Sequence, residues 1–362
     1  MFLHFLKKLD WVLMVSVFLL VAIGLLSIFS TTFYHEKNYF YKQAAFIVVG
    51  FFLMILFAAL DYRYFRNHPT LLLALYFVSV ILLAAVLFLG KGVRGSTSWF
   101  NFGLINFEPV ELAKLVMILI LAQYFSLRHI ELYRLIHIII SGIYTFVVAG
   151  LVFFQPDLGS AAVLIFLWLG VMLVAGIKFR QLVILFLIGI IIFSIAWMVI
   201  LKPYQKQRIT SFINPYLDPK GSGYHRIQSM IAIGSGKLLG RGLGQGSQSQ
   251  LDFLPEQHTD FIFASIAEEM GFVGVVLIFI FYFIFFFRIV KTALIASNNF
   301  GRLFCIGAAI VFIFQVFVNI GMNLGLLPIT GISLPFISYG GSNLLISFVM
   351  LGIVQSINVR EK

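Results

Sequence analysis

Charged residues and cysteines are scarce in this chain of 362 residues. Asp, Glu, Lys and Arg make up 11% of it, against about 25% in soluble domains. Because 61% of the residues are hydrophobic, the composition excludes a soluble globular protein and indicates a chain that crosses a membrane several times. The single cysteine, Cys305, excludes an intrachain disulfide and a cysteine-rich metal site.

Acidic residues are also few, 14 against 25 Lys and Arg, so the net charge is +11. In a membrane protein such an excess orients the loops and attracts anionic lipid, and it does not indicate a nucleic-acid partner. The beginning of the chain lacks an Ala-x-Ala cleavage signal. Its first apolar run is long enough to span the membrane, so we expect a retained first helix.

Apolar runs of about 20 residues, the length that crosses the hydrocarbon core, predict an all-α polytopic membrane protein with ten transmembrane helices. The predicted spans are 11–31, 40–60, 70–89, 108–126, 135–154, 159–177, 181–201, 260–287, 303–325 and 338–357. One connection is different, because residues 202–259 between helices 7 and 8 are long, polar and rich in Gly, Gln and Ser. We expect a single membrane domain, 1–362, with this segment as its extracytoplasmic loop.

The distribution of Lys and Arg between the short loops predicts the orientation. One side of the membrane would hold Lys7, Lys8, Arg63, Arg66, Arg128, Arg134, Lys178, Arg180, Arg288, Lys291, Arg302, Arg360 and Lys362. The other side would hold Lys37, Lys91 and Arg94. Since cytoplasmic loops are the basic ones, both termini are predicted to be cytoplasmic and the loop 202–259 to face outward.

Two charged residues lie inside the fourth predicted span, in FEPVELAKLVMIL. Glu111 and Lys114 are three residues apart, so a helix places them on one face. Pro109 fits the first turn of that helix, where its missing N–H is not needed. An internal ion pair explains these charges, and so does a role in lining a polar cavity; both interpretations stay open.

The densest polar stretch precedes the eighth span, in LPEQHTDFIFASIAEEMGF (254–272). Asp260 follows His258 closely, and an acid in the first turn of a helix can cap it. The stretch holds more polar residues than a cap needs, and Glu268 lies about 12 Å deeper along the helix. We therefore predict a polar cavity that opens outward with Asp260 at its mouth. Asp157, in a turn between the fifth and sixth spans, is a helix cap or a ligand of a cation or substrate.

The loop 202–259 carries two further candidates, Arg226 and Lys237, which could meet an anion such as a lipid phosphate. Its glycines do not form a nucleotide-binding loop, because Lys237 is followed by Leu238 rather than Ser or Thr. YHRIQSMIAIGSG predicts a short amphipathic helix. In the last outward loop, the Gly- and Pro-broken sequence around Ser338 is typical of a backbone that lines a cavity, or of a re-entrant turn without a ligand.

The segments LPEQHTDFIFASIAEEMGF, GYHRIQSMIAIGSG, GQGSQSQLDFLPE, QPDLGSA and TGISLPFISYGGSN together resemble the SEDS family of shape, elongation, division and sporulation proteins. The resemblance covers residues 10–357, and GSQSQLDFLPEQHTDFIFA is more similar to the elongation members than to the division members. GKGVRGSTSWFNFG is a loose version of the family's Gly-Ala-x-x-Trp loop, with Arg94 and Trp99 as its recognisable residues. Glu111 and Lys114 match the family's Glu and Lys, whereas Glu108 and Val110 depart from its usual Gln and Ser.

This resemblance implies a peptidoglycan glycosyltransferase of the bacterial cytoplasmic (inner) membrane, with its active site facing outward. Such enzymes polymerise lipid II into glycan strands. They work with a class B penicillin-binding protein, which cross-links the strands, and with other membrane proteins of the elongation complex. The family's essential aspartate corresponds to Asp260.

The chemistry of glycosyl transfer explains why an acid and cations would be needed. One carboxylate acting as general base, without a carboxylate nucleophile, implies inversion, so that an α-linked diphosphate donor gives a β-1,4 glycan. Asp260 is the predicted base. Glu111, Lys114, Arg94, Arg226, Lys237, His258 and Ser338 are the predicted substrate-binding residues. Lys114, Arg226, Lys237 or a divalent cation, Mg²⁺ or Mn²⁺, would stabilise the leaving pyrophosphate.

Two other functions are compatible with ten spans that contain charges. A lipid II flippase would use the Glu111–Lys114 pair as a moving ion pair, and it predicts polar groups in both halves of the membrane. A non-catalytic scaffold for the penicillin-binding protein predicts that Asp260 is dispensable. The concentration of candidate residues in the predicted outer half favours the enzyme.

Overall fold

The computed structural model describes residues 7–32, 38–93, 96–101, 103, 106–128, 135–200, 203–214 and 221–361. Its long helices are α2 (Trp11–Thr32), α3 (Asn38–Ala59), α5 (Pro69–Leu89), α6 (Pro109–Leu127), α7 (Leu135–Phe154), α8 (Leu158–Ala175), α9 (Phe179–Ile195), α13 (Ile262–Ile295), α14 (Asn299–Asn323) and α15 (Gly341–Glu361).

The predicted membrane fold is confirmed. Within the described ranges, nine of these helices are long and apolar enough to cross a membrane. The exception is α9, which has 17 residues and continues into a π-helical turn, Ala196–Ile200. Together the two segments match the seventh predicted span, so the structure has a helical segment for each of the ten predicted spans.

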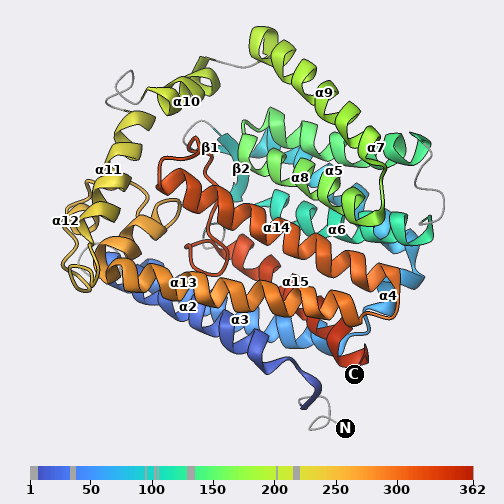
Figure 1. Cartoon of the computed structure of the whole chain (residues 1–362), viewed down its shortest axis with the longest axis horizontal. Helices are drawn as coiled ribbons and strands as arrows, with labels where there is room; N and C mark the ends of the chain where they lie inside the picture. The colour runs from blue at the N-terminus through green and yellow to red at the C-terminus, as the bar shows by residue number, and fades with distance from the viewer. Residues whose placement is uncertain are drawn as a thin grey trace.

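The centre of the bundle is formed by α6, α14 and α15. Between 72% and 83% of their spanning windows is buried inside the structure, against 22% for α3. Around them, α15 packs along α3, and α13 packs against α2 and α14 (Figure 1). Small residues permit the close approach of α15 to α3, because a Cβ on Gly352 would lie 2.7 Å from the carbonyl oxygen of Met54.

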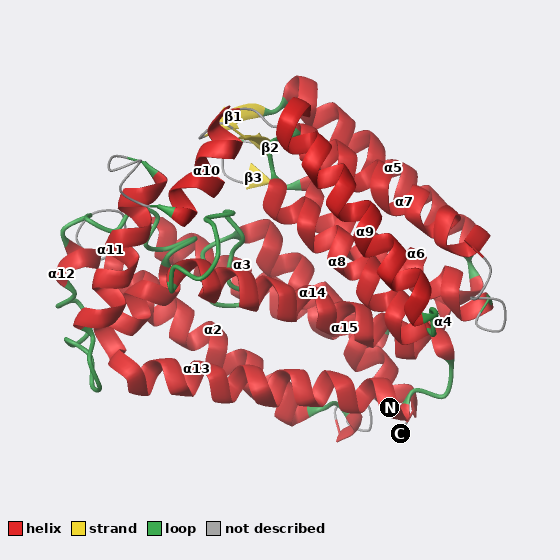
Figure 2. Ribbon diagram, turned by 45° about the horizontal axis from the view of Figure 1, so that its top comes forward, coloured by secondary structure: helices red, strands yellow, loops and turns green. Residues whose placement is uncertain are grey.

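The segment between α5 and α6 forms a small antiparallel sheet that the sequence analysis did not predict. Its strands are β1 (Lys91–Val93), β2 (Ser96–Asn101) and β3 (Asn106–Phe107), in the order β1-β2-β3. Phe100 pairs with Phe107, and Asn101 with Asn106. Figure 2 shows the sheet at the end of the bundle away from the two chain termini.

The long connection between α9 and α13 contains three helices in its described part, α10 (Pro203–Ile213), α11 (Ser222–Ser235) and α12 (Ser247–Gln250). The predicted amphipathic helix is therefore present as α11, and it packs on α13. The described part of the connection is folded into these short helices at one end of the bundle (Figure 1).

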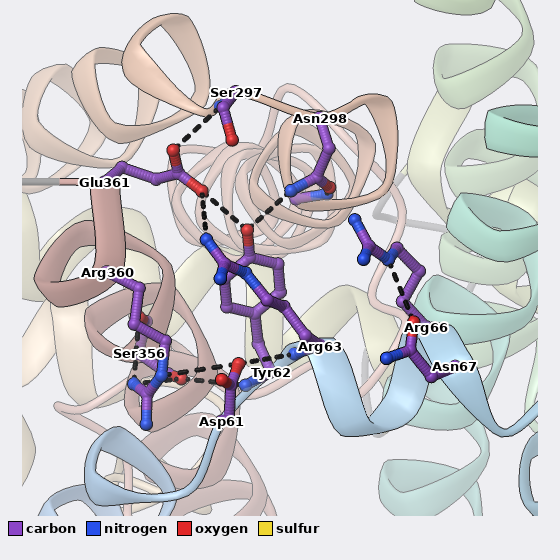
Figure 3. Close-up of polar contacts among 11 residues, drawn as sticks. Asp61, Tyr62, Arg63, Arg66, Asn67, Ser297, Asn298, Ser356, Arg360 and Glu361 are labelled. Atoms are coloured by element: carbon purple, nitrogen blue, oxygen red, sulfur yellow. Dashed lines mark hydrogen bonds and ion pairs between the residues drawn. The ribbon is translucent and has the colours of Figure 1, made fainter.

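The other end of the bundle, which carries both termini, is closed by paired polar groups next to the short helix α4 (Arg63–Asn67) (Figure 3). Tyr62 is buried and donates its hydroxyl to Glu361 at 2.7 Å, while Asn298 donates to the Tyr62 oxygen at 2.6 Å. The backbone N–H of Ser297 donates to the second oxygen of Glu361 at 3.1 Å. These contacts connect the α3–α4 turn, the α13–α14 turn and the last turn of α15.

Candidate active site

A polar cavity of about 360 Å³ lies at the end of the bundle away from the termini. Five segments form its wall: α3, the strands with the start of α6, the start of α8, the turn before α13, and the connection between α14 and α15 with the start of α15. Its lining includes Lys42, Ser98, Trp99, Asn106, Glu108, Glu111, Lys114, Asp157, Ser160, Glu256, Thr259, Asp260, Thr330, Gly331, Ser333, Tyr339, Ser342 and Asn343. Asp260, Glu111 and Lys114, which the sequence analysis selected separately, therefore meet in one cavity.

The floor of the cavity carries the Glu111–Lys114 ion pair. The Lys114 ammonium lies 2.8 Å from Glu111 Oε1, and the two residues are 2% and 5% exposed. Asn343, at the start of α15, donates to the same Glu111 oxygen at 3.3 Å and to Ser333 Oγ at 2.9 Å. Both interpretations left open by the sequence are thus present, because the residues form an internal ion pair and also border the cavity.

Asp260 is held in place through its backbone. Its carbonyl oxygen accepts hydrogen bonds from Asn319 Nδ2 at 3.1 Å and Asn323 Nδ2 at 3.0 Å, both on α14. Its side chain borders the cavity beside Gly331, where a Cβ would lie 3.7 Å from Asp260 Oδ2. Gly331 has a φ of 77°, which other residues rarely adopt, so the wall next to this carboxylate needs a glycine.

Two predicted residues, His258 and Ser338, support the turn that carries Asp260 and are not part of the cavity lining. Ser338 donates its hydroxyl to the carbonyl of Thr259 at 2.7 Å and accepts from the N–H of Leu334 at 2.8 Å. The carbonyl of His258 accepts from the N–H of Tyr339 at 2.9 Å. The centroid of the His258 ring lies 4.5 Å from that of the Tyr39 ring. Their geometry gives them a positioning role, and direct binding of substrate by either stays a prediction.

The predicted cations of the long connection also lie outside the cavity lining. The guanidinium of Arg226 donates to the carbonyls of Phe212 and Gly325 and covers the Phe212 ring, so it ties α10 and α11 to the end of α14. Lys237 is exposed and has a φ of 49° in the turn after α11. Arg94 lies outside the described residues. Binding of the pyrophosphate by Arg226 or Lys237, and of substrate by Arg94, stays a prediction.

Glu268 and Glu269 do not line the cavity, which corrects the expectation that Glu268 lies below Asp260 in the same polar space. Both are buried, and they bind the chain that follows α11. Glu268 accepts from the N–H groups of Gln248 and Ser249 at 2.8 and 3.0 Å, at the start of α12. Glu269 accepts from Ser30 Oγ at 2.6 Å. Backbone N–H groups of the loop bind both acids, with Gly244 donating to Glu269 at 3.1 Å, so the two carboxylates anchor the loop.

Asp157 caps a helix and also borders the cavity. Its Oδ1 accepts from the N–H of Ser160 at 2.9 Å at the start of α8. Glu108, just before α6, is partly buried in the cavity wall and accepts a side-chain hydrogen bond from Trp99. Burial, with the neighbouring charges of Glu111 and Asp157, raises the pKa of Glu108 to about 8.

Carboxylates outnumber cations in the cavity lining. Glu108, Glu111, Asp157, Glu256 and Asp260 face Lys42 and Lys114. Sequence reasoning did not select Lys42, or the two asparagines of α14 that hold Asp260. Asn319 and Asn323 are polar residues one helical turn apart in an otherwise apolar span, a signal that could have identified them.

The fold and the site define a polytopic membrane protein with an acidic cavity at one end of its helix bundle. The chain belongs to the family of FtsW, RodA and SpoVE, described as cell cycle proteins, whose family model matches residues 10–362. The resemblance to SEDS proteins is thereby confirmed.

Curated relatives and solved structures agree with this assignment. The chain is 37% identical over 316 residues to the peptidoglycan glycosyltransferase MrdB of Escherichia coli K12, covering 87% of this chain and 84% of the relative. It is 36% identical over 360 residues to stage V sporulation protein E of Bacillus subtilis 168, covering 96% of each. It is similar to the rod shape determining protein RodA of Thermus thermophilus, with a TM-score of 0.72 and 31% identity over 97% of this chain and 96% of that one.

A further solved structure has a TM-score of 0.84 and 33% identity, and covers 98% of both chains. It is described as "Structural coordination of polymerization and crosslinking by a peptidoglycan synthase complex".

Proposed function

We propose that this chain polymerises lipid II into β-1,4 glycan strands, with Asp260 as the general base. It is a peptidoglycan glycosyltransferase that acts in cell elongation, as its family and its curated and structural relatives indicate. The observation that supports the role of Asp260 is its position. Two asparagines hold its backbone carbonyl, and its side chain borders a polar cavity that also holds the Glu111–Lys114 pair.

The reaction needs a base because the acceptor hydroxyl loses its proton as it attacks the anomeric carbon. A positioned carboxylate contributes about 10²–10⁴ in rate. The hydrogen bonds from Asn319 and Asn323 fix the backbone of Asp260, so the carboxylate is placed before substrate binds. The acceptor oxygen displaces the diphosphate from the anomeric carbon in a single step, which inverts the configuration, so an α-linked diphosphate donor gives a β-linked product.

The leaving diphosphate is stabilised by positive charge, for which the cavity offers Lys114 and Lys42. Lys114 is already paired with Glu111, so we assign it to the orientation of the diphosphate and Lys42 to its capture near the rim. In the part of the chain that the structure describes, no group of three or more His, Cys, Asp or Glu side chains is arranged to hold a metal ion.

A requirement for Mg²⁺ or Mn²⁺ remains part of the proposal, with the ion entering together with the diphosphate. Polymerisation by the purified chain across a series of chelator and added Mg²⁺ measures it directly. Activity that falls in chelator and returns with Mg²⁺ supports the requirement, and unchanged activity removes it.

We also propose that both termini are cytoplasmic and that the cavity faces outward. The end of the bundle that carries the termini holds the basic residues Arg63, Arg288 and Arg360, as the charge rule requires of a cytoplasmic face. The native Cys305 is fully buried, so a maleimide should react with an introduced, exposed cysteine and not with Cys305. In intact cells an impermeant maleimide should label Leu239→Cys, which is 82% exposed, and should label Lys8→Cys only after permeabilisation.

The partner that we propose is a class B penicillin-binding protein, working with other membrane proteins of the elongation complex. The structure described as a peptidoglycan synthase complex, in which polymerization and crosslinking are coordinated, supports this assignment. Copurification of a tagged chain with the transpeptidase of its own cell tests it.

Polymerisation by the purified protein tests the proposed reaction. The native chain should convert lipid II into glycan, and Asp260→Ala should abolish the product while the protein still inserts and elutes as a folded species. Asp252→Asn is the matched control, because Asp252 is an exposed aspartate in the same connection. A liposome assay with fluorescent lipid II separates transport from synthesis: translocation without polymer would favour the flippase.

A further inference from the structure

One wall of the cavity is formed by the small sheet and by Glu108, the residue that precedes α6. Trp99 on β2 and Glu108 after β3 occupy the next antiparallel position beyond the Phe100–Phe107 pair, so their side chains lie on the same face. The indole N–H of Trp99 donates to the carboxyl group of Glu108. Both residues border the cavity.

This wall is rigidly attached to the rest of the site. The backbone N–H of Glu108 donates to Ser342 Oγ at 3.1 Å, and the same hydroxyl donates to the carbonyl of Asn106 at 3.1 Å. The junction between β3 and α6 is therefore fixed to the start of α15. A side chain on such a junction is held in place before a ligand arrives.

The chemistry of the wall suits a neutral, ring-shaped ligand. Trp99 is partly exposed, so part of its indole is accessible from the cavity, and an aromatic face packs well against the C–H face of a pyranose ring. Glu108 in its neutral form offers one donor and one acceptor, which match a sugar hydroxyl or an acetamido group. A neutral acid also avoids repulsion with a diphosphate bound nearby.

A second observation points to a polar ligand at the same wall. Ser98, which precedes Trp99, borders the cavity and is 1% exposed. Its hydroxyl oxygen has no hydrogen-bond partner among the residues that the structure describes. Buried hydroxyl groups are normally satisfied, so this group is available to a ligand that fills the cavity.

We propose that Trp99 and Glu108 form a subsite for an N-acetylated sugar ring of the lipid-linked substrate, in which the indole packs on the ring and the carboxyl group hydrogen-bonds its polar substituents. This inference rests on the proposed function, because it names which part of that substrate the sheet holds. It also gives the three-stranded sheet a function, namely to carry the sugar-binding wall of the cavity.

A binding experiment without turnover tests the subsite. Affinities of purified Asp260→Asn protein for lipid II and for undecaprenyl diphosphate, which has the same tail and diphosphate but no sugar, would be measured in detergent. Adding Trp99→Ala should weaken lipid II binding about tenfold and leave undecaprenyl diphosphate unchanged. Trp99→Phe, which keeps an aromatic ring, should lose about threefold.

Equal weakening for both lipids would show that the sheet acts only as structure, and unchanged lipid II binding would place the sugar elsewhere; either result overturns the subsite. Because the experiment needs no catalysis, it is independent of whether Asp260 is the base. A failure of the proposed polymerase would appear in the turnover assay with native protein.

The protonation of Glu108 gives a second test, since its pKa is about 8. The charged groups around it are Glu111 and Lys114 of α6 and Asp157 before α8, with Lys42, Glu256 and Asp260 elsewhere in the lining. Lipid II binding by the Asp260→Asn protein should weaken between pH 7 and pH 9 as Glu108 ionises. Glu108→Gln, a permanently neutral donor and acceptor, should bind as well at pH 9 as at pH 7.

If Glu108→Gln instead keeps the pH response of its parent, another group in the cavity causes it and the role of Glu108 is wrong. If Glu108→Gln and Glu108→Ala weaken binding equally at pH 7, a neutral hydrogen-bonding group is not what the site needs. Either outcome removes Glu108 from the subsite.

Discussion

The two ends of the helix bundle use the same kinds of side chain in opposite ways. At the end with the termini, Asp10 lies 2.6 Å from Arg288, and Arg360 lies 3.3 Å from Asp61, so acids and bases form pairs. At the cavity end, five acidic side chains and two lysines share the lining. Paired charges connect helices at one end, and at the other end acidic side chains border a cavity.

At the end of the bundle that carries the termini, polar contacts join the ends of neighbouring helices. Arg360, near the end of α15, donates to the carbonyls of Ala58 and Ala59 at 3.1 and 2.7 Å, which would otherwise be unsatisfied at the end of α3. Burial and the nearby Glu361 raise the pKa of Tyr62, so its hydroxyl stays a donor to Glu361 at physiological pH. These groups stabilise the fold and are far from the cavity, at the other ends of α13 and α15.

Breaking the Glu111–Lys114 pair of the cavity should have the largest effect. Lys114→Met leaves Glu111 buried without its cation, which costs about 3–5 kcal/mol of stability, and it also removes charge from the diphosphate. We expect both the melting temperature and polymerisation to fall. The double variant Glu111→Gln, Lys114→Met should recover much of the stability and none of the activity; recovery of activity would make the pair purely structural.

The hydrogen bonds that hold the backbone of Asp260 can be removed without changing its carboxylate. Asn319→Ala removes one hydrogen bond to the Asp260 carbonyl and one to Ile332, so the base is placed less well. We expect kcat to fall about tenfold, with a smaller change in KM. Gln315, a buried polar residue one turn earlier on α14, gives the matched control, and an equal loss in Gln315→Ala would contradict a specific role for Asn319.

Ionisation of Glu108 should make the free energy of unfolding depend on pH. Its folded pKa of about 8 lies above the usual value of 4.5, so ionisation is unfavourable in the folded protein and native stability falls as pH rises between these values. Glu108→Gln lacks this loss. Its melting temperature relative to native protein should therefore increase from pH 5 to pH 8, by about 2 °C or more, and level off above pH 8. A constant difference across that range would contradict the raised pKa.

The smallest effect is expected for an exposed ion pair at the end of the bundle that carries the termini. Arg63 lies 3.8 Å from Glu361 and is 44% exposed, and exposed ion pairs contribute about 0–1 kcal/mol. Arg63→Ala should change the melting temperature by less than about 2 °C and leave polymerisation unchanged. A large loss of activity would show that the two ends of the bundle are coupled.

Much of the fold could be predicted because length and hydropathy determine a transmembrane span directly. The ten predicted ranges coincide with helical segments, including the atypical one in which α9 ends and a π-helical turn follows. The sheet was not predicted because its strands are two to six residues long and depend on pairing partners that a hydropathy window does not detect.

The site could be predicted only in part. Asp260, Glu111 and Lys114 stood out because charge is rare in apolar spans, and they do share one cavity. Glu268 stood out for the same reason, yet its partners are backbone N–H groups of a distant loop, which a sequence does not reveal. Arg226 is likewise bound to carbonyls that lie far away along the chain.

The central claim is that the carboxylate of Asp260 acts in chemistry, whereas the carboxylate of Asp10 at the other end acts in folding. One measurement compares them: lipid II polymerisation and thermal stability of purified Asp260→Asn and Asp10→Asn. We expect Asp260→Asn to lower kcat at least about 10²-fold and to leave the melting temperature of the protein unchanged. Asp10→Asn should lower the melting temperature and keep kcat. Retained polymerisation by Asp260→Asn, at native stability, would contradict the account.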